Sequence, residues 1–277
     1  MKSSSMIRSL PLVLSTILGA GVSIGCDGRQ NGTDTTADSA SKSTPTTEAD
    51  EKEMATMRLQ LSLGNDTATP DSVKKELALG ADPRWVSDDF DDNLLVKAVN
   101  IKTNYKISDI DIDPTNKAKM KLSILNARSS ATWMPPKDPE NIARICEILI
   151  KAGADVNHAS KLGRTPLVAC MRYCQTPTIK VLLAAGADPN NYEVPDSTPT
   201  SPLAMAVSHQ CPEAIILLLK AGAKVDQDQI IYRDTKKLGP MMEVARNDSP
   251  KLKGTPALAA LEKAAADAKT SGSKSTS

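Results

Sequence analysis

The chain has 277 residues, a formal net charge of +1 and aromatic side chains at 3% of its positions. A near-neutral charge without a basic block argues against nucleic acid as the partner, because nucleic-acid-binding surfaces concentrate Lys and Arg. The two histidines, His158 and His209, have no Ser, Cys or carboxylate at a spacing that suggests a catalytic triad, so we expect no enzyme activity.

The first 25 residues have the pattern of a secretory signal peptide. Lys2 and Arg8 precede an apolar stretch at 10–24 that is shorter than a membrane-spanning helix. The stretch ends in Val-Ser-Ile-Gly-Cys at 22–26, which resembles a bacterial lipobox. This resemblance implies lipidation of Cys26 and export to the bacterial cell envelope, as a membrane-anchored lipoprotein in the periplasm or on the surface. An ordinary secretory cleavage beside an unrelated cysteine is the alternative.

A polar segment follows at 26–52, in which Asp, Thr, Ser, Ala and Gly dominate. Such a composition cannot bury enough apolar surface to order the chain. We therefore expect a disordered tether between the anchor and a folded domain at 53–269. Residues 270–277 are similar in composition, and we expect a disordered tail there.

Within the folded domain, four segments end in closely similar tetrapeptides. They are Leu-Gly-Ala-Asp at 79–82, Ala-Gly-Ala-Asp at 152–155 and 185–188, and Ala-Gly-Ala-Lys at 221–224. Gly153, Gly186 and Gly222 are 33 and 36 residues apart, and a fixed period in this range is typical of stacked repeats. Apolar residues before each glycine recur at helical spacing, so we expect the glycine to end a helix in a left-handed conformation.

A second shared signal lies about 19 residues before two of these glycines: Thr-Pro-Leu at 165–167 and Ser-Pro-Leu at 201–203. Ser or Thr caps a helix, and Pro at the first helical position loses no hydrogen bond. Each unit is therefore predicted to be a short helix, a tight turn, a second helix, and a glycine that leads into an extended loop.

These units resemble ankyrin repeats. Gly-Arg-Thr-Pro-Leu-Val-Ala at 163–169 is similar to the family's Gly-x-Thr-Pro-Leu-His-x signature, and Ala-Gly-Ala-Asp-Val-Asn at 152–157 to its repeat ending. The resemblance implies an all-α stack of helix pairs, with finger loops along one edge of a concave face, that binds another protein. Val168 and Ala204 replace the family's usual histidine, so we expect the hydrogen bond from that ring to neighbouring loops to be absent.

The spacing predicts about five helix pairs and one long insertion. Asp92 is the expected cap of a helix that starts at Leu94, and 59 residues separate Leu94 from Gly153 where other units have 19. We infer an insertion at about 100–139, and a degenerate repeat hidden in it is the alternative. Residues 120–127 fit a helix in either case.

Two irregular helix pairs are expected at the ends of the stack, at 57–63 with 73–77 and at 239–245 with 256–266. Atypical terminal units are normal in repeat proteins, because each must present a polar outer face to water.

No cofactor and no metal is predicted. Asp-Ile-Asp-Ile-Asp at 109–113 resembles the start of a calcium loop, but Pro114 replaces the required glycine and Met120 the final glutamate, so a short strand fits better. An enzyme or metal-binding protein with its site in the insertion is one alternative function. A cytosolic repeat regulator is the other.

The four remaining cysteines fall into two kinds of position. Cys146 and Cys170 occupy core-facing positions and should behave as small apolar residues. Cys174 and Cys211 lie at the helix–helix turns of consecutive repeats, where an oxidising compartment would permit a disulfide. Two free thiols are the alternative, because adjacent repeats are spaced more widely than the usual Cα separation of about 5.5 Å.

Candidate partner-binding residues lie in the predicted loops and the insertion. Most are aromatic, and aromatic side chains bury a large area at low entropic cost. The candidates are Trp85, Phe90, Trp133, His158, Arg164, Tyr192 and Tyr232. The alternative is that the aromatic side chains fix long loops onto the stack.

Overall fold

The computed structural model describes ten stretches of the chain. They are 47–64, 67–88, 91–100, 102–103, 132–133, 138–161, 163–191, 201–226, 229–233 and 236–272, with the backbone alone at 102–103, 132–133, 232–233 and 271–272. The expected signal peptide and Cys26 lie outside these residues. All the elements belong to one compact unit, Ser43–Ser277.

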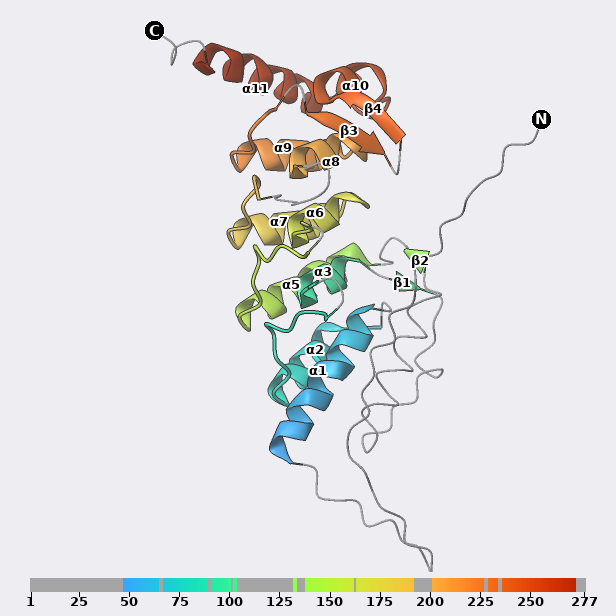
Figure 1. The fold of residues 1–277 in the computed structure, drawn as a ribbon, viewed down its shortest axis with the longest axis vertical. Coiled ribbons are helices and arrows are strands. Elements are labelled where there is room, and N and C mark those ends of the chain that lie inside the picture. The colour runs from blue at the N-terminus through green and yellow to red at the C-terminus, as the bar shows by residue number, and fades with distance from the viewer. Residues whose placement is uncertain are drawn as a thin grey trace, which may run out of the picture. The chain divides into compact units, whose positions relative to one another are not determined.

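The helices form successive contacting pairs. These are α1 (Glu48–Gly64) with α2 (Pro70–Ala78), α3 (Leu94–Val99) with α5 (Pro139–Lys151), α6 (Pro166–Met171) with α7 (Thr176–Ala184), α8 (Pro202–Ser208) with α9 (Pro212–Lys220), and α10 (Met241–Asn247) with α11 (Pro256–Gly272). Each pair packs on the next through two layers (Figure 1). One layer runs α1, α3, α6, α8, α10 and the other α2, α5, α7, α9, α11.

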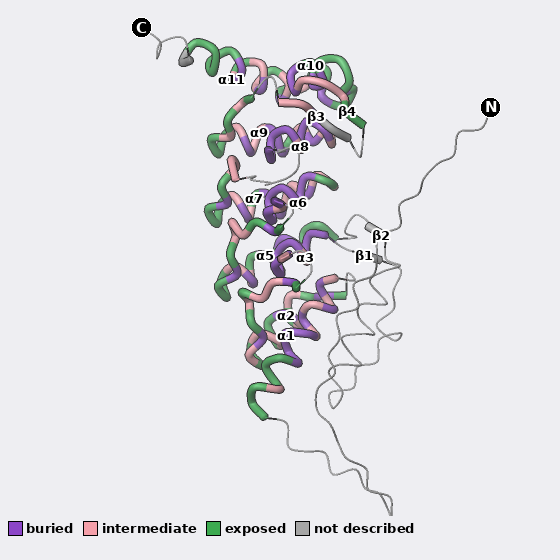
Figure 2. The backbone as a smooth tube through the Cα atoms, in the orientation of Figure 1, coloured by how far each residue is buried: buried purple, intermediate pink, exposed green. Residues whose placement is uncertain are grey.

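The core lies between the two layers. Figure 2 shows the buried residues concentrated on α3, α6 and α8, whereas the ends of the second-layer helices are exposed. The buried side chains are mainly Leu, Ile, Val and Ala, as the helical spacing predicts. Cys146 and Cys170 are fully buried within this core, so their predicted role as small apolar residues is confirmed.

The repeat-ending glycines end helices as predicted. All four have φ between 87° (Gly186) and 106° (Gly153), which a residue without a Cβ adopts at no steric cost. The amide of the following alanine then closes the helix end, as Ala154 N does at 3.0 Å from Leu149 O. This hydrogen bond from the residue after the glycine to the last full turn is the Schellman closure.

Two of the predicted helix starts are also confirmed. Thr165 Oγ1 accepts a hydrogen bond from Val168 N at 3.2 Å, and Ser201 Oγ accepts one from Ala204 N at 3.1 Å.

The predicted cap of α3 is wrong by one residue. Asn93 caps the helix, because its Oδ1 accepts from Val96 N at 2.9 Å. Asp92, the expected cap, instead turns its carboxylate toward Arg164 on the next loop.

Helix α1 begins inside the segment predicted to be a disordered tether, 26–52. Thr47 and Asp50 cap each other's backbone amides at 3.1 and 3.2 Å, and Lys52 pairs with Glu48 one turn away at 2.7 Å. Local capping and charge pairing, not apolar content, set this helix start. At the other end, α11 continues through Gly272, into the predicted tail at 270–277.

The two ends of the segment predicted to be an insertion are joined to each other. Strand β1 (Lys102–Thr103) pairs antiparallel with β2 (Thr132–Trp133), and the flanking helices α3 and α5 pack together. Residues 103 and 132, far apart in the sequence, are therefore brought together. The predicted helix at 120–127 and the aspartate run at 109–113 lie outside the described residues.

A second hairpin was not predicted. Strand β3 (Ile230–Arg233) pairs antiparallel with β4 (Lys236–Pro240), with an irregularity between Ile231 and Tyr232. The placement of Tyr232 in a loop is therefore wrong, since the run Ile-Ile-Tyr-Arg favours a strand. Ile231 is fully buried and joins the helical core.

None of the helices in the described stretches is both long and apolar enough to cross a membrane.

Candidate functional site

The candidate site is the row of loops that follow the repeat glycines, which we call the finger loops. Their described parts are 81–88 with 91–93, 154–161 with 163–165, 187–191 and 223–226.

The repeated aspartate shapes the start of three finger loops. Asp82, Asp155 and Asp188 each accept a hydrogen bond on Oδ1 from the backbone amide two residues later, at 2.9, 2.9 and 2.8 Å. This local turn needs a short side-chain acceptor at that position. The Gly-Ala-Asp signature is thus a helix end followed at once by a turn.

Two asparagines connect the second finger loop to the third and the third to the fourth. Asn157 Nδ2 donates to Gly186 O at 3.0 Å, and its Oδ1 accepts from Asp188 N at 2.8 Å. Asn190 repeats the pattern one unit later, with Gly222 O at 3.2 Å and Lys224 N at 2.8 Å. These amides link the loops although the histidine of the repeat signature is absent. Neither asparagine was predicted to bind a neighbouring loop, and their 33-residue spacing was the available signal.

The first and second finger loops are held together by charged groups. Arg164 Nη2 lies 3.2 Å from Asp92 Oδ2, and Asp92 is buried, with 8% of its surface exposed. Lys161 Nζ lies 3.3 Å from Asp91 Oδ1. His158 Nε2 bonds to the backbone carbonyl of Asp91. Because a carbonyl only accepts, this bond requires the hydrogen on Nε2.

Trp85 lies in the first finger loop and packs this loop against the helices. Its ring is partly buried against the helical core, and Lys97 Nζ on α3 lies 5.1 Å from the ring centroid. A cation at this distance attracts the ring face. At this residue the structure favours the alternative in which an aromatic side chain fixes its loop onto the stack.

The structure therefore brings together part of the predicted set. His158 and Arg164 lie against the same short segment, 91–92, and Trp85 anchors the loop that carries it. The other candidates are placed by backbone alone, Trp133 in β2 and Tyr232 in β3, or lie outside the described residues, Phe90 and Tyr192.

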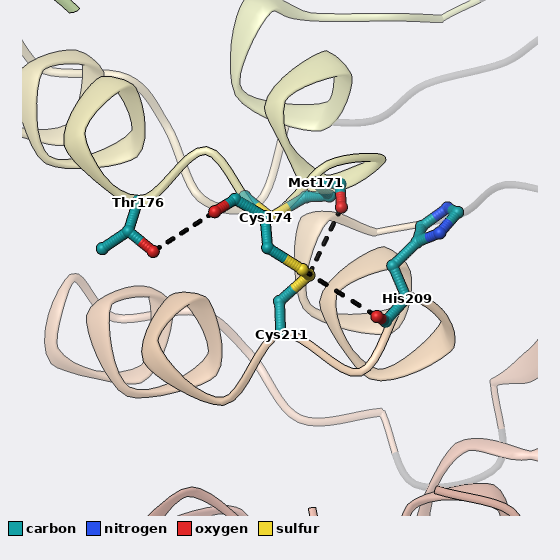
Figure 3. The surroundings of a disulfide bond; sticks show 5 residues. All are labelled: Met171, Cys174, Thr176, His209 and Cys211. Atoms are coloured by element: carbon teal, nitrogen blue, oxygen red, sulfur yellow. Dashed lines mark hydrogen bonds between the residues drawn. A yellow bond between two sulfur atoms is a disulfide. The ribbon is translucent and has the colours of Figure 1, made fainter. Parts of the chain in front are cut away.

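At the opposite ends of the helices, the structure joins Cys174 and Cys211 in a disulfide (Figure 3). Their Cα atoms are 5.3 Å apart, so the two turns lean together, which the wider average spacing of repeats did not suggest. Cys174 lies in the turn after α6 with φ of 49°, and Cys211 is the residue before α9.

In the described part of the chain, no three His, Cys, Asp or Glu side chains gather where they could hold a metal ion.

Comparison with known families identifies part of the chain. Residues 139–229 match the family model described as Ankyrin repeats (3 copies). The matched range begins at the first residue of α5 and ends just before β3, so it includes the Asn157 and Asn190 links and the disulfide. No curated protein matches the chain. Over residues 139–229 the chain is similar to ankyrin repeats, a family that generally forms non-enzymatic modules for protein–protein interaction.

Proposed function

We propose that this chain is a non-enzymatic protein-binding module, tethered to a bacterial envelope membrane through lipidated Cys26. Its five helix pairs would act as one ankyrin-type stack with an insertion at about 100–139. The partner is another protein, bound through the finger loops and the concave face.

One observation carries this proposal: consecutive finger loops are tied to one another. Asn157 and Asn190 join loops across the repeats, and Arg164 with Asp92 joins the first two. A binding edge whose loops are already ordered loses less conformational entropy when a partner docks. Ordered loops therefore favour a role in binding, whereas loops that only connect helices do not need to be ordered.

We assign the candidate residues two roles. Three candidates contact other residues of this chain and would hold the loops in position: Trp85, His158 and Arg164. Phe90, Tyr192, Tyr232 and Trp133 would supply the contact area for the partner, because buried aromatic side chains dominate protein interfaces.

Cross-linking in envelope preparations tests the binding role. A triple Phe90→Ala, Tyr192→Ala, Tyr232→Ala variant should recover at least about tenfold less of the cross-linked partner, the loss of one interface hot spot. Tyr173→Ala is the matched control, since Tyr173 follows α6 at the far turn, and it should recover the wild-type amount. Equal recovery with the triple variant would remove these three aromatic side chains from the proposal.

A second experiment tests the anchor. Cells grown with labelled fatty acid should label the wild-type chain, and Cys26→Ser should lose the label and move from the membrane to the soluble fraction. Unlabelled wild-type protein found in the cytosol would favour the cytosolic regulator instead.

A further inference from the structure

At three junctions between neighbouring helix pairs, a turn between paired helices is bonded to the neighbouring pair. Gln175 Nε2 donates to Val99 O at 2.8 Å and ties the α6–α7 turn back to α3. Lys251 N donates to Gln210 Oε1 at 3.1 Å and ties the α8–α9 turn forward to the segment before α11. The Cys174–Cys211 disulfide joins the α6–α7 turn to the α8–α9 turn and so lies between these two hydrogen bonds along the row of helix pairs. The tie in the middle of the row is therefore covalent and depends on oxidation.

The surroundings of the disulfide suit its reduced form as well. Cys211 Sγ lies 3.4 Å from Met171 O, and Cys174 Sγ lies 3.9 Å from His209 O (Figure 3). A disulfide sulfur carries no hydrogen, so in the oxidised chain these are contacts only. After reduction each thiol faces a carbonyl of the other repeat and can donate a weak S–H···O hydrogen bond. The α6–α7 and α8–α9 turns can thus be joined by the disulfide in the oxidised chain and by weak hydrogen bonds in the reduced chain, without a change in the backbone of either turn.

The two cysteine residues differ in burial. Cys174 is partly exposed, whereas Cys211 is fully buried. We therefore expect an incoming thiolate to attack at Cys174.

We propose that the Cys174–Cys211 disulfide is a reversible redox switch that sets how tightly the α8–α11 part of the stack is held to the α6–α7 pair. The reductant is a dithiol, either a small one or that of a thioredoxin-like protein. Its thiolate bonds to Cys174 Sγ, the S–S bond breaks, and Cys211 leaves with the electron pair and takes a proton. The second thiol of the reductant then displaces Cys174, which leaves as a thiol. The protein gains two electrons and two protons, and the reductant becomes a disulfide.

The other two core cysteines are kept out of this exchange. Cys146 and Cys170 are fully buried. Burial raises the pKa of the Cys146 thiol to about 12 and raises that of Cys170 as well. Because the thiolate is the nucleophile in thiol exchange, neither competes for the disulfide near neutral pH.

Amide hydrogen exchange on the full chain tests the switch. Oxidised protein, protein reduced with dithiothreitol, and a Cys174→Ser, Cys211→Ala variant are compared. Peptides around 171–175 and 209–215 should exchange at least about tenfold faster in the reduced and variant chains. Peptides from α5 should be unchanged, and air oxidation of the reduced wild type should restore slow exchange. A Cys146→Ala chain should respond to dithiothreitol as the wild type does.

Brief reduction followed by iodoacetamide provides a second readout that needs no variant. Cys174 should be alkylated before Cys211. Equal exchange in both redox states would overturn the proposal, as would unfolding of the whole stack on reduction. Four alkylatable thiols besides Cys26 in air-oxidised protein that is denatured before alkylation would overturn it too. None of these measurements involves the partner or the anchor, so the switch and the proposed function can fail separately.

Discussion

Short polar side chains order the finger loops by forming hydrogen bonds with backbone groups. Extended loops expose backbone amides and carbonyls that need partners. Asp82, Asp155 and Asp188 satisfy amides within their own loop, and Asn157 and Asn190 satisfy groups of the next loop. An asparagine suits this position because its amide donates and accepts at once.

Asn157→Ala removes both hydrogen bonds to the following loop and should lower the free energy of unfolding by about 1–2 kcal/mol. Urea unfolding followed by circular dichroism measures the change. Asn247→Ala, at the exposed end of α10, is the matched control and should stay within about 0.5 kcal/mol of the wild type. A loss no larger than that of the control would show that the Asn157 bonds contribute nothing net.

Strand β3 places one fully buried side chain, that of Ile231, in the helical core. Its neighbour Ile230 is partly exposed. Successive strand residues point to opposite faces, which accounts for the different burial of these two neighbours.

Ile231→Ala should cost about 2–5 kcal/mol, because a large buried side chain leaves a cavity. Ile230→Ala provides the matched comparison within the same strand and should cost clearly less. Thermal unfolding of both variants measures the difference. Similar losses would mean that the hairpin is not anchored through Ile231.

The disulfide adds a covalent constraint between neighbouring helix pairs, closing a loop with a sequence separation of 37. A closed loop of this size limits the unfolded chain, so Cys174→Ser with Cys211→Ala should lower stability by about 2–4 kcal/mol. Reduced wild-type protein should unfold at nearly the same urea concentration as this variant. If it unfolds where the oxidised protein does, the disulfide adds no stability.

Across the whole molecule, each helix pair packs mainly on its neighbours, through two continuous layers. The stability of such a stack is close to a sum of pair and interface contributions, and its ends matter because they cover the core. Helix α1 covers one end and begins at Glu48.

A chain that starts at residue 47 should therefore unfold at the same midpoint as one that starts at residue 27. A chain that starts at residue 53, the boundary predicted from composition, loses the Thr47 cap and the first helical turn. It should be less stable by about 1 kcal/mol, the usual contribution of a helix cap. Denaturant unfolding of the three chains distinguishes these expectations. Equal midpoints for all three would support residue 53 as the start of the folded domain.

The sequence alone determined the repeat period, the glycine helix ends and the Thr165 and Ser201 helix starts. The helix ends and helix starts are local features, because a few adjacent residues determine the backbone conformation there. The tertiary structure decided that Asn93 and not Asp92 caps α3, that Asn157 reaches the next loop, and that the Cys174 and Cys211 turns lean within bonding distance. Those outcomes depend on contacts between residues that are far apart in the sequence, such as Asn157 with Gly186 and Cys174 with Cys211, or on the competition of Arg164 for Asp92, and no local pattern predicts them.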